Sequence, residues 1–195
     1  MTFNLAYAYI LSVMRTLNFR LIGTSPLLLH RTAKHQLREH IASNINHGER
    51  FEEEALEVMS KDAVGNPAVP VSWLWDAIRV GCSRITVEGK QISYVKVSAA
   101  MSLRPKDFIP LKSTDGQTPE WRVYKSVQHA GPSSKKSILV VAPEFRDWAL
   151  EVMVRCHLDF PDDELLLKIF TEAGRVGIGL FHPPKKHFGQ FRCGV

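Results

Sequence analysis

The stretch DWALEVMVRCHLDF, residues 147–160, constrains the fold of this chain more than any other. Apolar side chains occupy every second position, and this two-residue period is typical of a β-strand with one buried face. We expect the opposite, mixed face to be accessible. The residues predicted to face a core are Trp148, Leu150, Val152, Val154, Cys156 and Leu158, and those predicted to face outward are Asp147, Ala149, Glu151, Met153, Arg155 and His157.

Two segments have the three-to-four-residue spacing of amphipathic helices. In residues 71–85, an apolar stripe joins Val71, Leu74, Trp75, Ile78 and Cys82. Trp73 lies off this stripe, which favours packing on a neighbouring element over a stacking platform. Residues 161–174 begin with acids, continue with a Leu, Ile and Phe stripe and end at a glycine, so we expect a helix that stops at Gly174.

Shorter patterns complete the fold prediction. We expect strands at 16–23, 91–100, 107–111, 120–128, 137–143 and 189–195, the fourth of them at a sheet edge, and helical stretches within 33–60. The minimal order is β-α-β-β-α-β, which predicts an α+β, ferredoxin-like (RRM-like) core. We expect a single domain over 1–195, with a possible extra N-terminal segment at 1–15, a helical insertion at 24–68 and a long loop at 101–137. Either Met1 or Met14 could be the true start.

Composition points to a globular protein with an anionic partner. The chain has 195 residues, 45% of them hydrophobic, and a net charge of +5. A basic balance of this size favours nucleic acid, although many basic proteins bind none. The three cysteines match no zinc-ligand spacing, which favours buried thiols in a reducing cytoplasm. The apolar start lacks the basic region and cleavage site of a signal peptide, so we expect a cytoplasmic protein.

The motifs of common enzyme classes are missing from the sequence. There is no GxSxG, no HExxH and no Walker loop, and GRVGIG follows a predicted helix rather than opening one, unlike a dinucleotide fingerprint. We therefore expect no catalytic residue, no metal site and no cofactor.

The last 22 residues, GRVGIGLFHPPKKHFGQFRCGV, are rich in glycine and basic residues and contain no acid. Glycines allow a backbone to approach an anion closely and leave N–H groups free to meet it. Lysines and arginines supply charge for phosphates. On composition alone, a solvated basic hairpin is an equal alternative.

These motifs carry a resemblance to a known family. A helix followed by AGRVGIG, a basic stretch and FGQF resembles the C-terminal glycine-rich loop of the RAMP superfamily of CRISPR-associated RNA-binding proteins. GNPAVPVSWLWDAIRVGCSRI resembles the proline-containing loop and first helix of that family. Small relatives occur in phages and prophages; where their pattern has an acid and an arginine, this chain has Leu180, Phe181 and His182.

The resemblance implies a ferredoxin-like core, contact of the glycine-rich loop with a guide-RNA backbone, and side-by-side oligomers with other subunits. It also implies a protruding thumb, for which 112–136 is the candidate. We therefore expect a non-catalytic RNA-binding subunit, with Arg155 on an accessible strand face as a further contact. The predicted nucleic-acid-binding residues are Arg175, Gly177, Gly179, Lys185, Lys186, His187, Gly189, Arg192, Arg122, Lys125, Lys135, Lys136 and Arg20.

Two alternatives stay open. One is a phage-encoded interaction module that mimics or inhibits a CRISPR subunit and binds protein without nucleic acid. The other is a metal-independent RNA-processing nuclease of the RAMP type, for which His30, His182 and His187 are the candidate residues.

Overall fold

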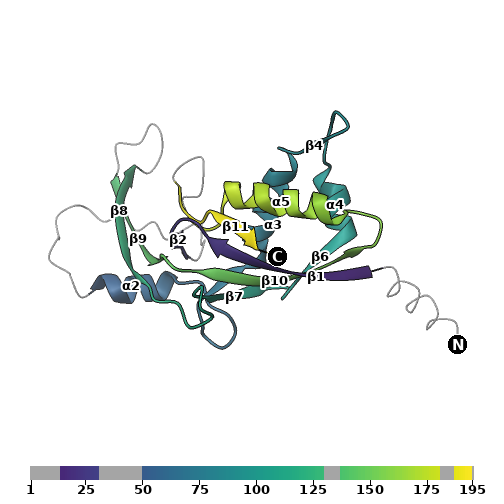
Figure 1. Cartoon of the computed structure of the whole chain (residues 1–195). Helices are drawn as coiled ribbons and strands as arrows, with labels where there is room; N and C mark the ends of the chain where they lie inside the picture. Colours follow the sequence, from purple (N-terminus) through teal and green to yellow (C-terminus); the bar gives the residue numbers. More distant parts are fainter. Residues whose placement is uncertain (1–13, 31–49, 130–136, 181–186, 195) are drawn as a thin grey trace, which may run out of the picture.

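The computed structural model describes residues 14–30, 50–129, 137–180 and 187–194. They form a mixed α/β fold built on antiparallel sheets (Figure 1). The main sheet has six strands in the order β11-β1-β10-β7-β3, with β6 also paired to β10. Its strands are β1 (Met14–Gly23), β3 (Ala68–Pro70), β6 (Met101–Arg104), β7 (Phe108–Lys112), β10 (Ala149–His157) and β11 (Phe191–Gly194).

Three helices lie on one side of this sheet: α3 (Val71–Cys82), α4 (Tyr94–Ala100) and α5 (Asp163–Val176) (Figure 1). The predicted helix at 71–85 is confirmed, and four of its five stripe residues are buried while Trp75 is half-buried. Asp162 caps α5 by accepting a hydrogen bond from the N–H of Leu165.

The predicted end of the second helix at Gly174 is wrong. The helix α5 continues to Val176, and Gly177, with φ of 79°, ends it. Gly174 is needed for packing instead, because a Cβ there would lie 2.1 Å from the carbonyl oxygen of Phe191 in β11.

The predicted strand at 91–100 is also wrong, because most of it forms the helix α4. Ser93 caps this helix by accepting a hydrogen bond from the N–H of Lys96. The segment ends in two alanines, which favour a helix. Its alternation of polar and apolar residues therefore did not reflect a strand.

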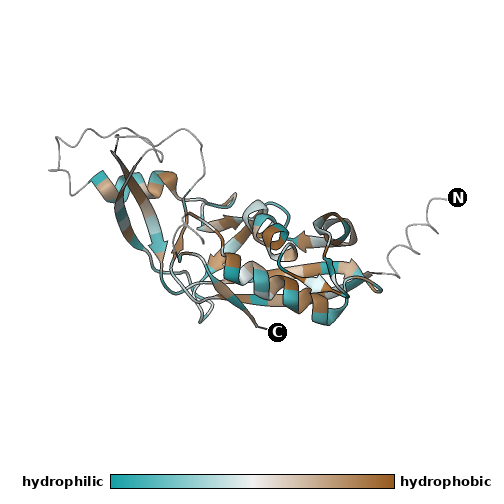
Figure 2. Cartoon of the chain, turned by 90° about the horizontal axis from the view of Figure 1, so that it is seen from above, coloured by the Kyte–Doolittle hydropathy of each residue, from teal (hydrophilic) through white to brown (hydrophobic). Residues whose placement is uncertain are grey.

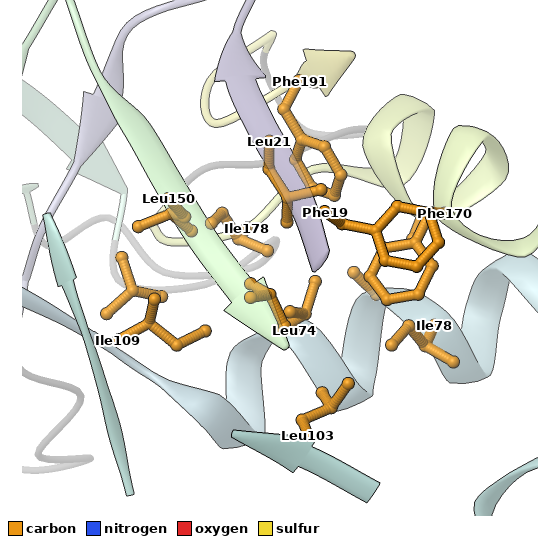
Figure 3. Close-up of a cluster of buried hydrophobic side chains, with 14 of the residues drawn as sticks. Phe19, Leu21, Leu74, Ile78, Leu103, Ile109, Leu150, Phe170, Ile178 and Phe191 are labelled. Atoms are coloured by element: carbon orange, nitrogen blue, oxygen red, sulfur yellow. The ribbon is translucent and has the colours of Figure 1, made fainter. Parts of the chain in front are cut away.

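The core lies between the main sheet and its helices (Figure 3). Phe19 of β1 stacks on Phe170 of α5, with ring centroids 4.6 Å apart. The alternation that predicted β10 is confirmed for Leu150, Val152, Val154 and Cys156, which are all buried, whereas Ala149, predicted on the accessible face, is buried as well. Leu158 lies beyond the strand and is 50% exposed, unlike its prediction.

A smaller sheet and α2 (Arg50–Val58) lie at one end of the molecule, opposite the start of β1 (Figure 1; Figure 2). This sheet contains β2 (Leu27–Leu28), β9 (Ser137–Phe145) and β8 (Arg122–His129), with β8 at its edge as predicted. A short hairpin, β4 (Thr86–Val87) and β5 (Lys90–Gln91), follows α3. Within 101–137, β6 and β7 belong to the main sheet, so only the part after Lys112 leaves it. None of the described helices is long and apolar enough to cross a membrane.

Candidate nucleic-acid interface

The side of the main sheet opposite α3 and α5 carries no described helix (Figure 1), and we call it the open face. Directly paired residues of antiparallel strands point to the same side. The register places Arg20 opposite Glu151 and Arg192 opposite Ile22, on the side away from Phe19 and Leu21. By the same rule five basic residues share this face with one acid, Glu151: they are Arg20, Lys112, Arg104, Arg155 and Arg192.

The acid on the open face is already neutralised. Lys112 donates a hydrogen bond to Glu151 at 2.8 Å, and this contact lowers the pKa of the Glu151 carboxyl below its usual value. Arg20 donates to the backbone carbonyl of Thr114 and keeps its charge. Among the described residues, no carboxylate forms an ion pair with Arg104, Arg155 or Arg192. The open face therefore presents a surplus of positive charge to solvent.

Backbone hydrogen bonds join the glycine-rich segment after α5 to neighbouring parts of the chain. The N–H of Gly177 donates to Ala173 at 2.9 Å, and the N–H of Gly189 donates to the carbonyl of Pro26 at 2.7 Å. The N–H of Ile178 donates a hydrogen bond to the carbonyl oxygen of Gly189 at 3.0 Å. These amide groups of Gly177 and Gly189 are thus not free to meet an anion, contrary to the expectation from sequence.

Close backbone approach explains why glycines stand here. Gly189 has φ of 66°, and a Cβ on it would lie 1.8 Å from the carbonyl oxygen of Ile178. Gly179 has φ of 82°, and its Cβ would lie 2.8 Å from the carbonyl oxygen of Leu28. Side chains are excluded at both positions by conformation and by space. The described part of the segment therefore acts first as a packing element between α5, β2 and β11.

The remaining predicted cations lie elsewhere and mostly have local partners. Arg122 of β8 makes a two-pronged ion pair with Glu144, at 2.8 and 3.0 Å, and that carboxylate is 5% exposed. Lys125 sits over the ring of Phe51, with Nζ 4.2 Å from its centroid. Arg122 and Lys125 are thus tied into the smaller sheet and α2.

On the helical side of the main sheet, Arg175 forms an ion pair with Glu172 near the end of α5. His187 is exposed. Lys135, Lys136, Lys185, Lys186 and His182 lie outside the described residues.

Two of the predicted site residues, Arg20 and Arg192, thus lie together on the open face. Three further basic residues, Arg104, Lys112 and Arg155, lie on the same face. Arg155 was expected on an accessible strand face, and it is there. Arg104 and Lys112 were missed, although the alternation in the short strand 108–112 offered a signal for Lys112. Arg104 ends a four-residue strand that sequence reasoning did not predict.

The cysteines are not suited to nucleophilic chemistry. Burial raises the pKa of Cys82 and of Cys193 to about 11, so both thiols stay protonated near neutral pH. Cys156 is fully buried in β10. No group of His, Cys, Asp and Glu side chains within the described ranges is arranged to hold a metal ion.

Known proteins resemble this chain in fold but not in sequence. No protein-family model matches the chain, and no curated protein matches its sequence. A chain of the type III-B Cmr-beta complex bound to cognate target RNA superposes with a TM-score of 0.50 at 10% identity, over all of this chain and 66% of that one. Cmr6 from Pyrococcus furiosus superposes with a TM-score of 0.47 at 10% identity, over 95% of this chain and 100% of that one.

The chain therefore spans slightly less than two thirds of the Cmr-beta chain that it matches. The likeness covers every element described above. It confirms, at the level of the fold, the resemblance that the sequence motifs indicated. The chain therefore shares its fold with this chain of the type III-B Cmr-beta complex.

Proposed function

We propose that this protein is a non-catalytic subunit that holds the phosphate backbone of single-stranded RNA on the open face of its main sheet. The observation that carries the proposal is the surplus of basic side chains on this face, five against one acid that is paired with one of them, Lys112. Lysine and arginine contacts to phosphates give affinity that does not depend on sequence.

The topology supports the same surface. Four strands of the main sheet lie side by side in the order β11-β1-β10-β6. If these four are numbered by their order along the chain, the order across the sheet is 4-1-3-2, with α3 after the first strand and α5 after the third. We infer that this frame is ferredoxin-like. In RRM domains of that topology, RNA lies on the helix-free face and its bases stack on aromatic residues of the sheet.

The open face of this chain differs from that pattern in one respect. At the middle of its central strands β1 and β10 it carries Asn18, Arg20, Met153 and Arg155, and the ring side chains of this face lie nearer its margins, His157 at the end of β10 and Phe108 in β7. Phosphate contact rather than base stacking therefore follows from the side chains at the middle of this face. We therefore expect binding that tolerates any sequence and weakens steeply with salt.

RNA is the proposed ligand because the Cmr-beta complex of similar fold is bound to target RNA. Side-by-side assembly with other CRISPR-type subunits is part of the same proposal. The segment 112–136 remains our candidate for the thumb; it contains β8, which pairs with β9 in the smaller sheet at one end of the main sheet (Figure 1).

The test is a salt titration of binding to a fluorescent single-stranded RNA of mixed sequence. Each lost phosphate contact lowers the slope of log affinity against log salt by about 0.7. Replacing Arg104, Arg155 and Arg192 together by Gln should therefore reduce the slope by about 2. RNA of uniform length that copurifies and is degraded by RNase but not DNase would further support the proposal.

A matched control removes the same charge from the helical side. Arg84, Lys90 and Lys96 are exposed and lie away from the open face. Their joint replacement by Gln should leave the salt slope near that of the unmodified protein. Equal losses in both triple variants, or no salt-dependent binding by the unmodified protein, would contradict the proposal.

A further inference from the structure

A cleft of about 580 Å³ opens at one edge of the main sheet, between the end of α2 and the start of α3. Phe108 of β7 and Pro70 of β3 form part of its wall, and β3 is the edge strand. A volume of this size is in the range of small-molecule sites, about 300–1,000 Å³. The cleft is therefore large enough to hold a small organic molecule.

Apolar and aromatic side chains make up much of the wall. Leu56 and Phe108 are 42% and 37% exposed, and Trp73 is half-buried against the core. Covering apolar surface of this kind with an alkyl chain is favourable. The faces of aromatic rings also attract cations. The wall therefore favours a ligand that carries methylene groups and a positive charge.

Two carboxylates of the same wall have no cation as a partner. Glu57 is exposed in the last turn of α2, and Asp62 follows that helix. Within the described ranges neither forms an ion pair, not even with Lys61, which lines the cleft beside them. Asp62 accepts hydrogen bonds from the N–H groups of Val64 and Asn66 through Oδ1 alone, which leaves Oδ2 for a ligand. The cleft is thus locally acidic in a chain whose net charge is +5.

The end of α2 adds to this negative potential. Leu56 and Glu57 of its last turn line the cleft, and that turn contains no basic residue. The C-terminus of a helix carries a partial negative charge, which cations stabilise. A phosphate is therefore disfavoured in this cleft, whereas an ammonium group meets the carboxylates, the helix end and the ring faces.

We infer that this cleft binds a linear polyamine. The ammonium groups of the ligand donate to the carboxylates of Glu57 and Asp62, which only accept hydrogen bonds. The methylene chain covers Leu56 and the rings of Trp73 and Phe108. Glu57 and Asp62 are five residues apart in sequence, so their Cα atoms lie at most about 17 Å apart, and polyamines of different length can match such a span. This inference does not depend on RNA binding by the open face.

The first measurement is isothermal titration calorimetry after any copurified RNA has been removed with RNase. The probes are putrescine, spermidine and 1,4-butanediol, which has the length of putrescine but no charge. Both amines should bind with millimolar or tighter affinity that weakens as salt is added, and butanediol should not bind. Since the protein carries a net positive charge, general attraction of a polycation is disfavoured and binding reports a local site.

A capped lysine distinguishes a free polyamine from a protein side chain. N-acetyl-lysine N-methylamide presents a single ammonium group on an alkyl chain, as a lysine of a protein partner would. It should bind several-fold more weakly than putrescine, because it can neutralise only one carboxylate at a time. Binding of the capped lysine as tight as that of putrescine would assign the cleft to a protein partner and overturn the polyamine inference.

Variants assign the contacts. Glu57→Gln should weaken putrescine binding by up to about fivefold, the value of one exposed ion pair. Asp62→Asn keeps an oxygen for the backbone N–H groups and should weaken binding on the same scale. Lys61→Gln removes the opposing charge and should tighten binding by a similar factor. Trp73→Leu should weaken binding by about two- to fivefold, since a cation–π contact contributes on that scale.

Glu52→Gln is the matched control. Glu52 is exposed in the first turn of the same helix and does not line the cleft, so its replacement should leave the affinity unchanged. The open-face triple variant should bind putrescine normally, which separates this test from that of RNA binding. Glu57 and Lys61 are exposed, so their variants keep the fold and the test stays decisive. No binding of putrescine at millimolar concentration, equal binding of butanediol, unchanged affinity in the Glu57→Gln and Asp62→Asn double variant, or weaker binding by Lys61→Gln would overturn the inference.

Discussion

Replacing Gly189 by Ala tests whether the glycine-rich segment is a packing element. Gly189 has φ of 66°, and the added Cβ would lie 1.8 Å from the carbonyl oxygen of Ile178. Left-handed backbone costs an L-residue about 1–2 kcal/mol. The carbonyl cannot stay where it is, so the surrounding backbone must also move.

That movement breaks further contacts. The N–H of Gly189 donates to Pro26 at 2.7 Å, and its carbonyl accepts from Ile178 at 3.0 Å. Each internal hydrogen bond contributes about 1 kcal/mol net. We therefore expect Gly189→Ala to lower the free energy of unfolding by at least about 3 kcal/mol, a fall in Tm of about 6–12 °C for a chain of this size.

Gly116 provides the matched control. It also has a positive φ, 89°, but a Cβ there meets nothing within 4 Å. Gly116→Ala should lower the free energy of unfolding by only about 1–2 kcal/mol. The assay is chemical denaturation followed by tryptophan fluorescence for both variants. If the two lose the same stability while Gly189→Ala alone loses RNA affinity, the packing argument is refuted and the glycine contacts RNA.

Three further predictions follow from ion pairs and burial. Arg122→Met should lower the free energy of unfolding by about 1–2 kcal/mol, because it leaves the nearly buried Glu144 with only a longer contact; a denaturation midpoint equal to that of the unmodified protein would contradict this. Glu151 should titrate below the ordinary glutamate pKa in an NMR titration and return towards it in Lys112→Met, so the small stability that the pair contributes is present above the unfolded pKa and is lost as pH falls through the folded value. Cys82 should resist thiol reagents at pH 8 in the folded protein and react quickly in denaturant, since burial raises its pKa to about 11; rapid labelling of the folded protein would disprove the assigned burial.

Long, strongly patterned elements could be predicted from the sequence, and short ones could not. The alternation of residues 149–157 and the stripe of 71–82 each extend over several repeats, so one period clearly prevails. Residues 94–100 are too few for that. Their alternation fits a strand as well as the helix they form, whose first turn is capped by Ser93.

The candidate site was only partly predictable, because it depends on strand register. Arg155 was expected on an accessible face, but nothing in the sequence shows that Ser102 pairs with it and so brings Arg104 beside it. The glycines were interpreted as places where nucleic acid approaches the backbone. The structure shows that neighbouring protein backbone takes that space at Gly189, and a glycine pattern alone does not distinguish the two.

The fold likeness to the Cmr-beta chain and the charge of the open face are independent observations. At 10% identity the Cmr-beta chain shares the arrangement of strands and helices with this chain, not the side chains on them. Within the described residues, this arrangement leaves one side of the main sheet without a helix, whereas the basic residues on that side belong to this sequence. Five basic residues against one acid, which Lys112 already pairs, leave this face with a surplus of positive charge. A basic surface favours an anionic partner, and the two triple variants test directly whether the open face has one.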